Sequence, residues 1–240
     1  MPVRRLITFF RAWEPRALAA LIMVTAGAWG AFALGDAVRD GETGRIDRWL
    51  LEIGRRPGDV GTMRGPSWFP EMVRDVTALG SVIVLSMATL GVAGFLWLAG
   101  KRKTTGFLLI ATISGAVAVS AMKTLVARPR PDLVPHLAHV SSGSFPSGHS
   151  MMSAVIYLTL GGLVMAVVHG RMLKMYILGV AVGLTILVGV SRVLLGVHYP
   201  SDVLAGWTIG LAWSEACWLI HAWWSGRLRV QKTLDEATDD

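Results

Sequence analysis

The stretch VTALGSVIVLSMATLGVAGFLWLAG (76–100) contains no charged residue, and the basic turn Lys101-Arg102-Lys103 follows it directly. A bilayer core of ~30 Å is crossed by about 20 helical residues, so an uncharged run of this length predicts a membrane-spanning helix. Inside lipid the backbone must satisfy its own hydrogen bonds, which favours helices over open strands. This stretch therefore points to an all-α membrane protein.

Five further runs of the same kind predict the rest of the fold. They cover residues 17–35, 104–122, 150–168, 175–191 and 203–220, and only Glu215 interrupts the last. We expect a bundle of six transmembrane helices in one domain (1–224), followed by a polar, disordered tail (225–240). A soluble helical core is the weaker alternative, because charged residues make up only 16% of the chain against ~25% in soluble domains.

The first run has a second interpretation as a signal peptide, since Ala31-Phe32-Ala33 resembles a cleavage site. The run is longer than the ~7–15 apolar residues of a signal core, so we expect a retained helix. Orientation follows from the basic residues. Placing the turn 101–103 in the cytoplasm puts both termini there as well, although the total number of basic residues on the two sides barely differs. We therefore expect a multi-pass protein of the inner (plasma) membrane, with its polar helix ends on the outer, periplasmic side.

A short amphipathic helix is predicted in the loop after the first span. Ile46, Trp49, Leu50 and Ile53 recur at i, i+3, i+4 and i+7, with charged residues between them. Such a helix lies on the bilayer surface with its apolar face in the lipid. It serves either as a structural cover or as a wall beside a lipid entrance, and the frequency of interfacial anchors favours the cover.

Three polar stretches at helix ends carry most of the functional information, because ionisable groups are costly at membrane depth. KTLVARPRP (123–131) leaves the third predicted span, and FPSGH (145–149) enters the fourth. SRVLLGVHYPSD (191–202) joins the fifth span to the sixth. Since consecutive spans alternate in direction, all three stretches lie on one face of the membrane and can form a single site.

The residues of these stretches favour an anionic ligand. Lys123, Arg130 and Arg192 bring three positive charges together, and the planar fork of arginine suits phosphate. Ser147 and Gly148 follow a proline suited to the first helical turn, and they offer backbone N–H groups at a helix N-terminus. The stretch is therefore expected to form a phosphate cradle.

Two histidines and a carboxylate complete the candidate site. His149 lies in the first turn of the cradle helix, and Asp202 follows His198 by four residues. A carboxylate at this spacing can hold the proton on one imidazole nitrogen and leave the other nitrogen free to attack. The second histidine can then protonate the leaving oxygen.

Together the three stretches resemble the signature of the type-2 phosphatidic acid phosphatase superfamily, K-x6-R-P, P-S-G-H and S-R-x5-H-x3-D, and all three match in order. The resemblance implies that His198 attacks phosphorus to form a phosphohistidine, that Asp202 orients His198, and that His149 donates the leaving-group proton. It further implies that no metal or other cofactor takes part and that five residues hold the phosphoryl oxygens: Lys123, Arg130, Ser147, Gly148 and Arg192.

The activity implied by this resemblance is hydrolysis of a lipid phosphomonoester or pyrophosphate. Phosphatidic acid, phosphatidylglycerol phosphate and undecaprenyl pyrophosphate all belong to this substrate class, and the sequence does not choose among them. A lipid phosphotransferase with the same intermediate and a non-catalytic lipid-binding protein are the alternatives. The chain contains no nucleic-acid motif, so its expected partners are the substrate and membrane lipids, and its oligomeric state is left open.

Several residues keep two interpretations. The RPRP sequence offers two Arg-Pro pairs, of which the family spacing selects Arg130, while the residues leave the role of Arg128 open. His136 and His139 lack an evident third metal ligand, so they are loop residues or headgroup contacts. Glu215 is either a functional acid inside the membrane or an interhelical hydrogen-bonding group.

Overall fold

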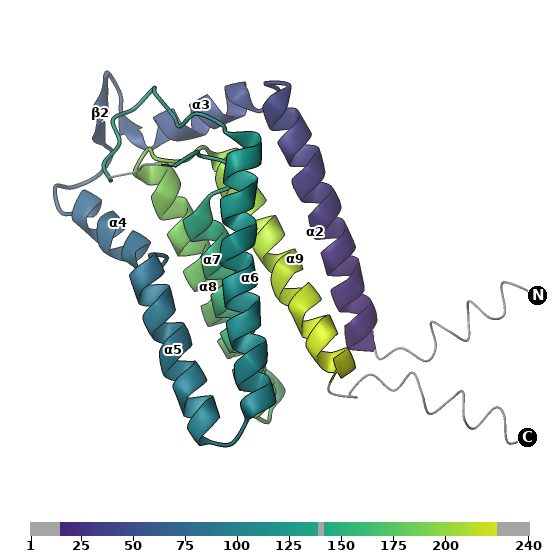
Figure 1. Cartoon of the computed structure of the whole chain (residues 1–240). Helices are drawn as coiled ribbons and strands as arrows, with labels where there is room; N and C mark the ends of the chain where they lie inside the picture. The colour runs from purple at the N-terminus through teal and green to yellow at the C-terminus, as the bar shows by residue number, and fades with distance from the viewer. Residues whose placement is uncertain (1–14, 139–141, 225–240) are drawn as a thin grey trace, which may run out of the picture.

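The computed structural model describes residues 15–138 and 142–224, so the predicted tail over 225–240 lies outside the described residues. Figure 1 shows a bundle of long helices that is capped at one end by shorter elements. The elements follow one another as α2 (Pro15–Arg39), α3 (Gly44–Ile53), β1 (Arg55–Arg56), β2 (Asp59–Met63), α4 (Phe69–Ala78), α5 (Val82–Leu98), α6 (Arg102–Val126), α7 (Gly148–Met165), α8 (Arg171–Leu194) and α9 (Pro200–Trp224).

The predicted all-α membrane bundle is confirmed, with one difference in its second span. Five helices (α2, α6, α7, α8 and α9) are long and apolar enough to cross a membrane, and α4 with α5 makes a sixth span if this pair, bent by 42°, counts as one. The uncharged run 76–100 hides this break. At the break the hydroxyl of Ser81 accepts a hydrogen bond from the N–H of Val84 at 3.3 Å, which starts α5. Serine and glycine carry no charge, so hydropathy alone does not reveal the bend.

Helix α7 lies at the centre of the bundle, where it packs against α6, α8 and α9, and α2 packs against α9. Lipid supplies no hydrophobic driving force between helices, so close contact between small residues stabilises such interfaces. Gly206 and Gly210 of α9 provide this contact. A Cβ atom at either position would lie within 3 Å of backbone or side-chain atoms of α7. The two helices can therefore bring their ends together at the candidate site.

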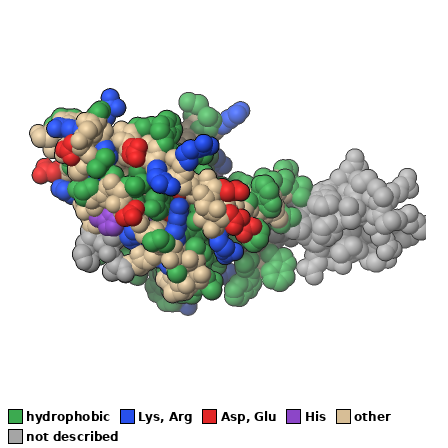
Figure 2. Space-filling view, turned by 90° about the horizontal axis from the view of Figure 1, so that it is seen from above, with side chains coloured by type: hydrophobic (Ala, Val, Ile, Leu, Met, Phe, Trp, Pro, Cys, Tyr) green, Lys and Arg blue, Asp and Glu red, His purple; other side chains and the backbone are tan. Residues whose placement is uncertain are grey.

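The loop after α2 contains the predicted amphipathic helix as α3, together with a two-stranded antiparallel hairpin, β1–β2, that the prediction did not include. Gly58, with φ of 81°, supplies the tight turn between the strands. In α3 the apolar row of Ile46, Trp49, Leu50 and Ile53 is exposed, as a helix resting on lipid requires. Figure 2 looks onto this end of the molecule and shows many basic and acidic side chains among hydrophobic ones.

The close approach of α9 to α7 leads to a prediction for Gly210→Val. A Cβ atom there would lie 2.6 Å from the carbonyl oxygen of Met151 and 2.7 Å from the Cβ atom of Ala154. We expect α9 to be pushed from α7, with a loss of about 1–3 kcal/mol of stability, measured by thermal unfolding of the purified protein in detergent. Gly183→Val is the control, since a Cβ at Gly183 meets nothing within 4 Å. A Gly210→Val protein that melts with this control would contradict the packing argument.

Candidate active site

Lys123 lies at the end of α6 and reaches the loop that leads to α7. Helix α6 continues to Val126, so Lys123 lies in its last turn, and Ala127 ends the helix in the left-handed conformation (φ 46°). The Lys123 ammonium donates to the hydroxyl of Ser142 at 3.0 Å and to the carbonyl oxygen of Gly143 at 2.9 Å. A Cβ atom added to Gly148 would lie 3.6 Å from Cε of Lys123. Lys123 therefore lies beside the start of α7.

The start of α7, which the sequence predicts to be a phosphate cradle, differs from the expectation in two respects. Pro146 lies before the N-cap residue Ser147 and not in the first helical turn. The backbone N–H of Ser147 is not free, because it donates to the carbonyl oxygen of Asp202 at 3.0 Å. Within the described part of the chain, the N–H groups of Gly148 and His149 have no partner. These two groups, at the positive end of the helix dipole, remain available to an anion.

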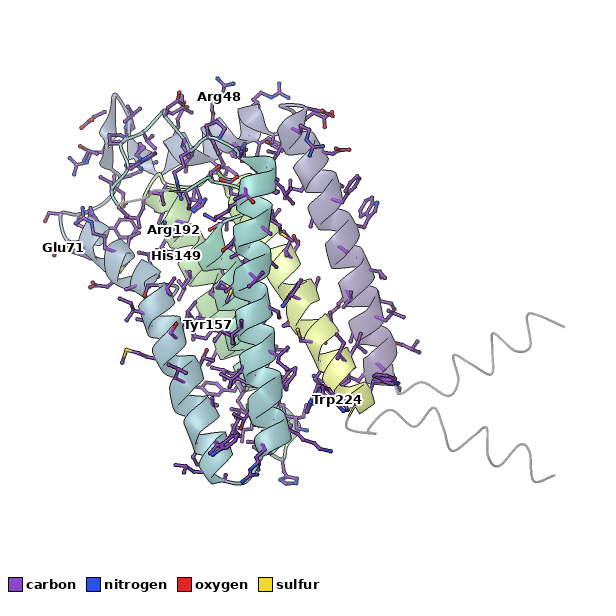
Figure 3. The ribbon with its side chains drawn as sticks, in the orientation of Figure 1. Arg48, Glu71, His149, Tyr157, Arg192 and Trp224 are labelled. Carbon is purple, nitrogen blue, oxygen red and sulfur yellow. The ribbon has the colours of Figure 1, made fainter. Side chains whose placement is uncertain are left out.

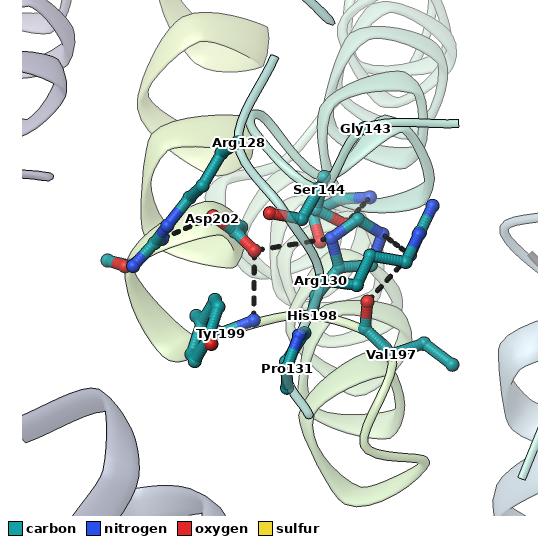
Figure 4. Close-up of polar contacts among 12 residues, drawn as sticks. Arg128, Arg130, Pro131, Gly143, Ser144, Val197, His198, Tyr199 and Asp202 are labelled. Atoms are coloured by element: carbon teal, nitrogen blue, oxygen red, sulfur yellow. Dashed lines mark hydrogen bonds and ion pairs between the residues drawn. The ribbon is translucent and has the colours of Figure 1, made fainter. Parts of the chain in front are cut away.

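His198 and Asp202 form a buried pair at the junction of α8 and α9. Their exposed fractions are 1% and 0%. The Nδ1 atom of His198 lies 3.5 Å from Oδ2 of Asp202, which is longer than an ordinary hydrogen bond. The backbone N–H of Tyr199 donates to the same oxygen at 2.9 Å and fixes the carboxylate (Figure 4). This arrangement leaves Nε2 as the nitrogen that faces away from the carboxylate.

Arg130 lies against that nitrogen, as the family spacing requires. Its Nη1 atom is 3.3 Å from Nε2 of His198 and donates to the carbonyl oxygen of Val197 at 2.6 Å. Burial lowers the pKa of His198 to about 4, although the nearby carboxylate of Asp202 opposes this shift. His198 is therefore neutral at pH 7, and the lone pair of Nε2 accepts from a guanidinium that can instead bind phosphate when a substrate is present.

Arg128 does not point at the imidazole but binds two carboxylates. Its Nη1 atom lies 2.6 Å from Oδ1 of Asp202, and its Nη2 atom lies 2.9 Å from Oδ2 of Asp47. The guanidinium also lies over the ring of Tyr199, with Cζ 4.2 Å from the ring centroid. Burial alone lowers the pKa of Arg128, but Asp202 and Asp47 outweigh burial and raise it. The residue left open by the sequence is thus a fully charged partner of the carboxylate beside His198.

Asp47 is the residue of this site that the sequence did not indicate. It belongs to α3, is 1% exposed, and accepts hydrogen bonds from the N–H and hydroxyl of Ser201 at 2.9 and 2.6 Å. A carboxylate in this position caps the N-terminus of α9. The one signal in the sequence is that Asp47 falls outside the apolar row of α3. The short surface helix is therefore attached to the His198–Asp202 junction by buried polar contacts.

Arg192 and His149 lie at the same end of the bundle (Figure 3). Nη1 of Arg192 donates to the hydroxyl of Thr77 on α4 at 3.2 Å, while its buried Nε has no partner in the described structure. His149 packs against the break between α4 and α5, since a Cβ atom at Gly80 would lie 3.3 Å from its ring. The charges of Arg192 and Lys123 both act on His149. The predicted site residues thus converge from α6, α7, α8 and α9.

The remaining residues that the sequence left open, His136, His139 and Glu215, are not part of this cluster. Nε2 of His136 is 2.7 Å from the carbonyl oxygen of Pro131, which makes His136 a loop-stabilising residue. His139 lies outside the described residues. Glu215 lies near the other end of α9, away from His198. In the described ranges, no group of three or more histidine, cysteine or acidic residues is arranged to bind a metal ion.

Comparison with known proteins identifies the family of this chain. The sequence model of the PAP2 superfamily matches residues 103–225. Phosphatidylglycerophosphatase B of Bacillus subtilis is 37% identical over 151 residues, which cover 60% of this chain and 71% of that protein. Decaprenylphosphoryl-5-phosphoribose phosphatase of Mycobacterium tuberculosis is 32% identical over 186 residues, which cover 74% of this chain and 87% of that protein.

A solved structure shows the same fold. The crystal structure of a transmembrane PAP2-type phosphatidylglycerolphosphate phosphatase from Bacillus subtilis superimposes with a TM-score of 0.74 at 24% identity, covering 88% of this chain and 100% of that one. The three signature stretches, the helical membrane bundle and these matches agree. The chain belongs to the PAP2 superfamily.

Proposed function

We propose that this protein is a metal-independent membrane phosphatase that hydrolyses a lipid phosphomonoester or pyrophosphate through a phosphohistidine on His198. One observation carries the proposal. The buried His198 keeps Nδ1 toward Asp202 and directs Nε2 toward the guanidinium of Arg130. A neutral imidazole next to an anion-binding arginine suits nucleophilic attack on phosphorus.

The proposed reaction proceeds in two steps. The lone pair of Nε2 forms a bond to phosphorus, and the bond from phosphorus to the bridging oxygen breaks as His149 gives that oxygen a proton. Water then attacks the phosphohistidine, gives a proton to His149, and the N–P bond breaks to release inorganic phosphate. Lys123, Arg130, Arg192 and the free N–H groups at the start of α7 neutralise the phosphoryl oxygens in both steps.

A lipid substrate is supported by an apolar groove beside the cradle. This groove, of about 520 Å³, lies between α2, α6 and α9, and its lining includes Phe145, which directly precedes the PSGH stretch. A hydrocarbon tail in the groove would leave its phosphate near Ser147. Relatives named as phosphatases of phosphatidylglycerophosphate and of a decaprenyl-linked phosphoribose agree with this substrate class.

The proposed orientation places the site on the outer face of the inner membrane, with both termini in the cytoplasm. The catalytic residues lie at the end of the bundle opposite the basic turn 101–103, and α2 begins and α9 ends on the side of that turn (Figure 1). Basic residues next to spans favour the cytoplasmic side.

His198→Ala is expected to abolish phosphate release because it removes the atom that forms the N–P bond. The measurement is inorganic phosphate released by purified protein from phosphatidic acid and from undecaprenyl pyrophosphate in detergent. His169→Ala, in the turn at the other end of α7, is the matched control and should retain activity. Turnover by His198→Ala at the control's rate would eliminate the proposed nucleophile. Transfer of labelled phosphate to a second lipid, without free phosphate, would identify a transferase instead.

Asp47→Asn is expected to lower kcat about 10²-fold with little change in KM, because a small displacement of His198 and Asp202 is sufficient for such a loss. The substitution weakens the contact to Arg128 and the cap on Ser201 without touching substrate. Steady-state kinetics on a soluble and a lipid phosphate measure the effect, and Asp47→Glu should restore part of the rate. If kcat fell equally in Asp47→Asn and Asp47→Glu, and both proteins melted at a lower temperature, Asp47 would have a purely structural role.

The acid limb of the pH profile is expected near pH 4. The pKa of His198 lies below the ordinary value of about 6.5 because a buried imidazolium loses its hydration. The imidazole therefore stays neutral as pH falls through 6.5 and is protonated only near pH 4, where kcat/KM should decline. Rates at each pH are corrected for the separately titrated ionisation of the substrate. A corrected limb centred at 6.5 would contradict the burial argument.

A further inference from the structure

A second large cavity lies at the end of the bundle opposite His198. Its volume is about 720 Å³, and its walls come from α2, the α5–α6 turn, α7 and α9. Figure 1 shows the α5–α6 turn and the adjoining ends of α2 and α9 at this lower end, and Figure 3 labels Trp224 there. No residue assigned to the catalytic site lines this cavity. It is therefore separate from the phosphatase site.

The lining of this cavity carries more positive than negative charge. Arg16, Lys101, Arg102 and Lys103 lie along it, and Glu215 is the one acidic residue among its lining. The charge of Arg16 acts on Glu215, which leaves the three residues of the basic turn without a carboxylate partner in the described structure. An anion entering the cavity would meet a net positive charge.

A buried hydroxyl group inside the cavity lacks a partner. Thr159 of α7 lines the cavity and is 6% exposed, and its Oγ1 atom has no hydrogen-bond partner in the described part of the structure. Threonine in a helix commonly bonds to a carbonyl of the preceding turn, as Thr185 does on α8. A buried hydroxyl without a partner costs free energy, so rotation of the Thr159 side chain toward a ligand oxygen in the cavity would be favourable.

The remaining walls suit a molecule with a polar head and an apolar body. Leu96, Leu163 and Val167 supply apolar surface. The guanidinium of Arg16 lies over the Trp218 ring, with Cζ 4.3 Å from the centroid, and so is held at the cavity by an aromatic contact. A free inorganic anion would use the charges but leave the apolar wall in contact with water.

We propose that this cavity binds the phosphate headgroup of an anionic phospholipid from the leaflet opposite the one that the catalytic residues face. The phosphate lies among the basic side chains, a headgroup oxygen accepts the hydrogen bond of Thr159, and the acyl chains follow the apolar wall into the bilayer. Basic pockets between transmembrane helices recognise anionic lipids by the same combination of charge and apolar contact. The site is independent of the proposed phosphatase activity, because a phosphodiester lipid can occupy it without reacting.

The test uses phosphatidylglycerol as probe, since it is a phosphodiester and not a phosphomonoester. Purified full-length protein in detergent is titrated with phosphatidylglycerol or phosphatidylcholine, and native mass spectrometry counts the lipids retained. The key variant is Gly162→Leu, because Gly162 lines the cavity and a Cβ there meets nothing within 4 Å. Its matched control is Gly91→Leu on α5, which has the same free space and does not line the cavity.

Wild-type protein and Gly91→Leu should retain phosphatidylglycerol saturably and in preference to phosphatidylcholine, and Gly162→Leu should lose this preference. Arg16→Gln and Lys103→Gln should each weaken retention about fivefold, the effect of removing one basic residue near a lipid headgroup. Equal retention by Gly162→Leu and Gly91→Leu would overturn the proposal. Competition by inorganic phosphate without any preference among lipids would also overturn it, in favour of a simple anion site. Phosphate release from a soluble substrate checks that each variant is folded, because the catalytic residues lie at the other end.

Discussion

The burial of the Asp202 carboxylate is the constraint on which the rest of the site depends. A buried carboxylate costs several kcal/mol unless charged and hydrogen-bonding partners surround it. Arg128, from the loop after α6, provides the charge at 2.6 Å, and the Tyr199 N–H provides a hydrogen bond at 2.9 Å. The backbone carbonyl oxygen of Asp202 accepts a hydrogen bond from the N–H of Ser147 at the start of α7. Asp202 therefore connects the three signature stretches. Because these contacts fix Asp202, they also fix the position of His198 beside it.

Much of this arrangement follows from the sequence for a simple physical reason. Uncharged runs must become helices in lipid, and ionisable groups gather where those helices end, so the convergence of 123–131, 145–149 and 191–202 could be predicted. The break at 79–81 could not be predicted, because the residues at this turn carry no charge and do not interrupt the hydropathy. The β1–β2 hairpin could not be predicted either, because its strands are too short to show a pattern. The pairing of Asp47 with Arg128 was also beyond prediction, since 81 positions separate the two residues.

The two arginines of RPRP illustrate what spacing can and cannot reveal. Arg128 and Arg130 are equivalent in a list of residue types, and Pro129 between them prevents any helical periodicity that would orient them. In the structure their roles differ, because Arg128 faces Asp47 and Asp202 while Arg130 faces Nε2 of His198. The choice depends on where the carboxylates lie in space. The PAP2 match begins at residue 103, so it includes Arg128 but not Asp47, and the support from α3 is visible only in three dimensions.

The different roles of Arg128 and Arg130 also explain how a site that contains both acidic and basic residues can still bind an anion. Asp47 and Asp202 both form ion pairs with Arg128, and the described structure shows no carboxylate paired with Lys123, Arg130 or Arg192. The acids are thereby used to hold the scaffold and the imidazole, while the remaining bases keep their charge for the ligand. The number of basic residues alone would not predict this capacity, because it is the pairing that decides which charges are left. A similar pairing applies at the far end of the bundle, where Arg16 acts on Glu215 and the turn 101–103 has no carboxylate partner among the described residues. Among the described residues, what separates the two ends chemically is the fully buried imidazole of His198 beside a carboxylate, since the histidine that lines the far cavity, His221, is only partly buried.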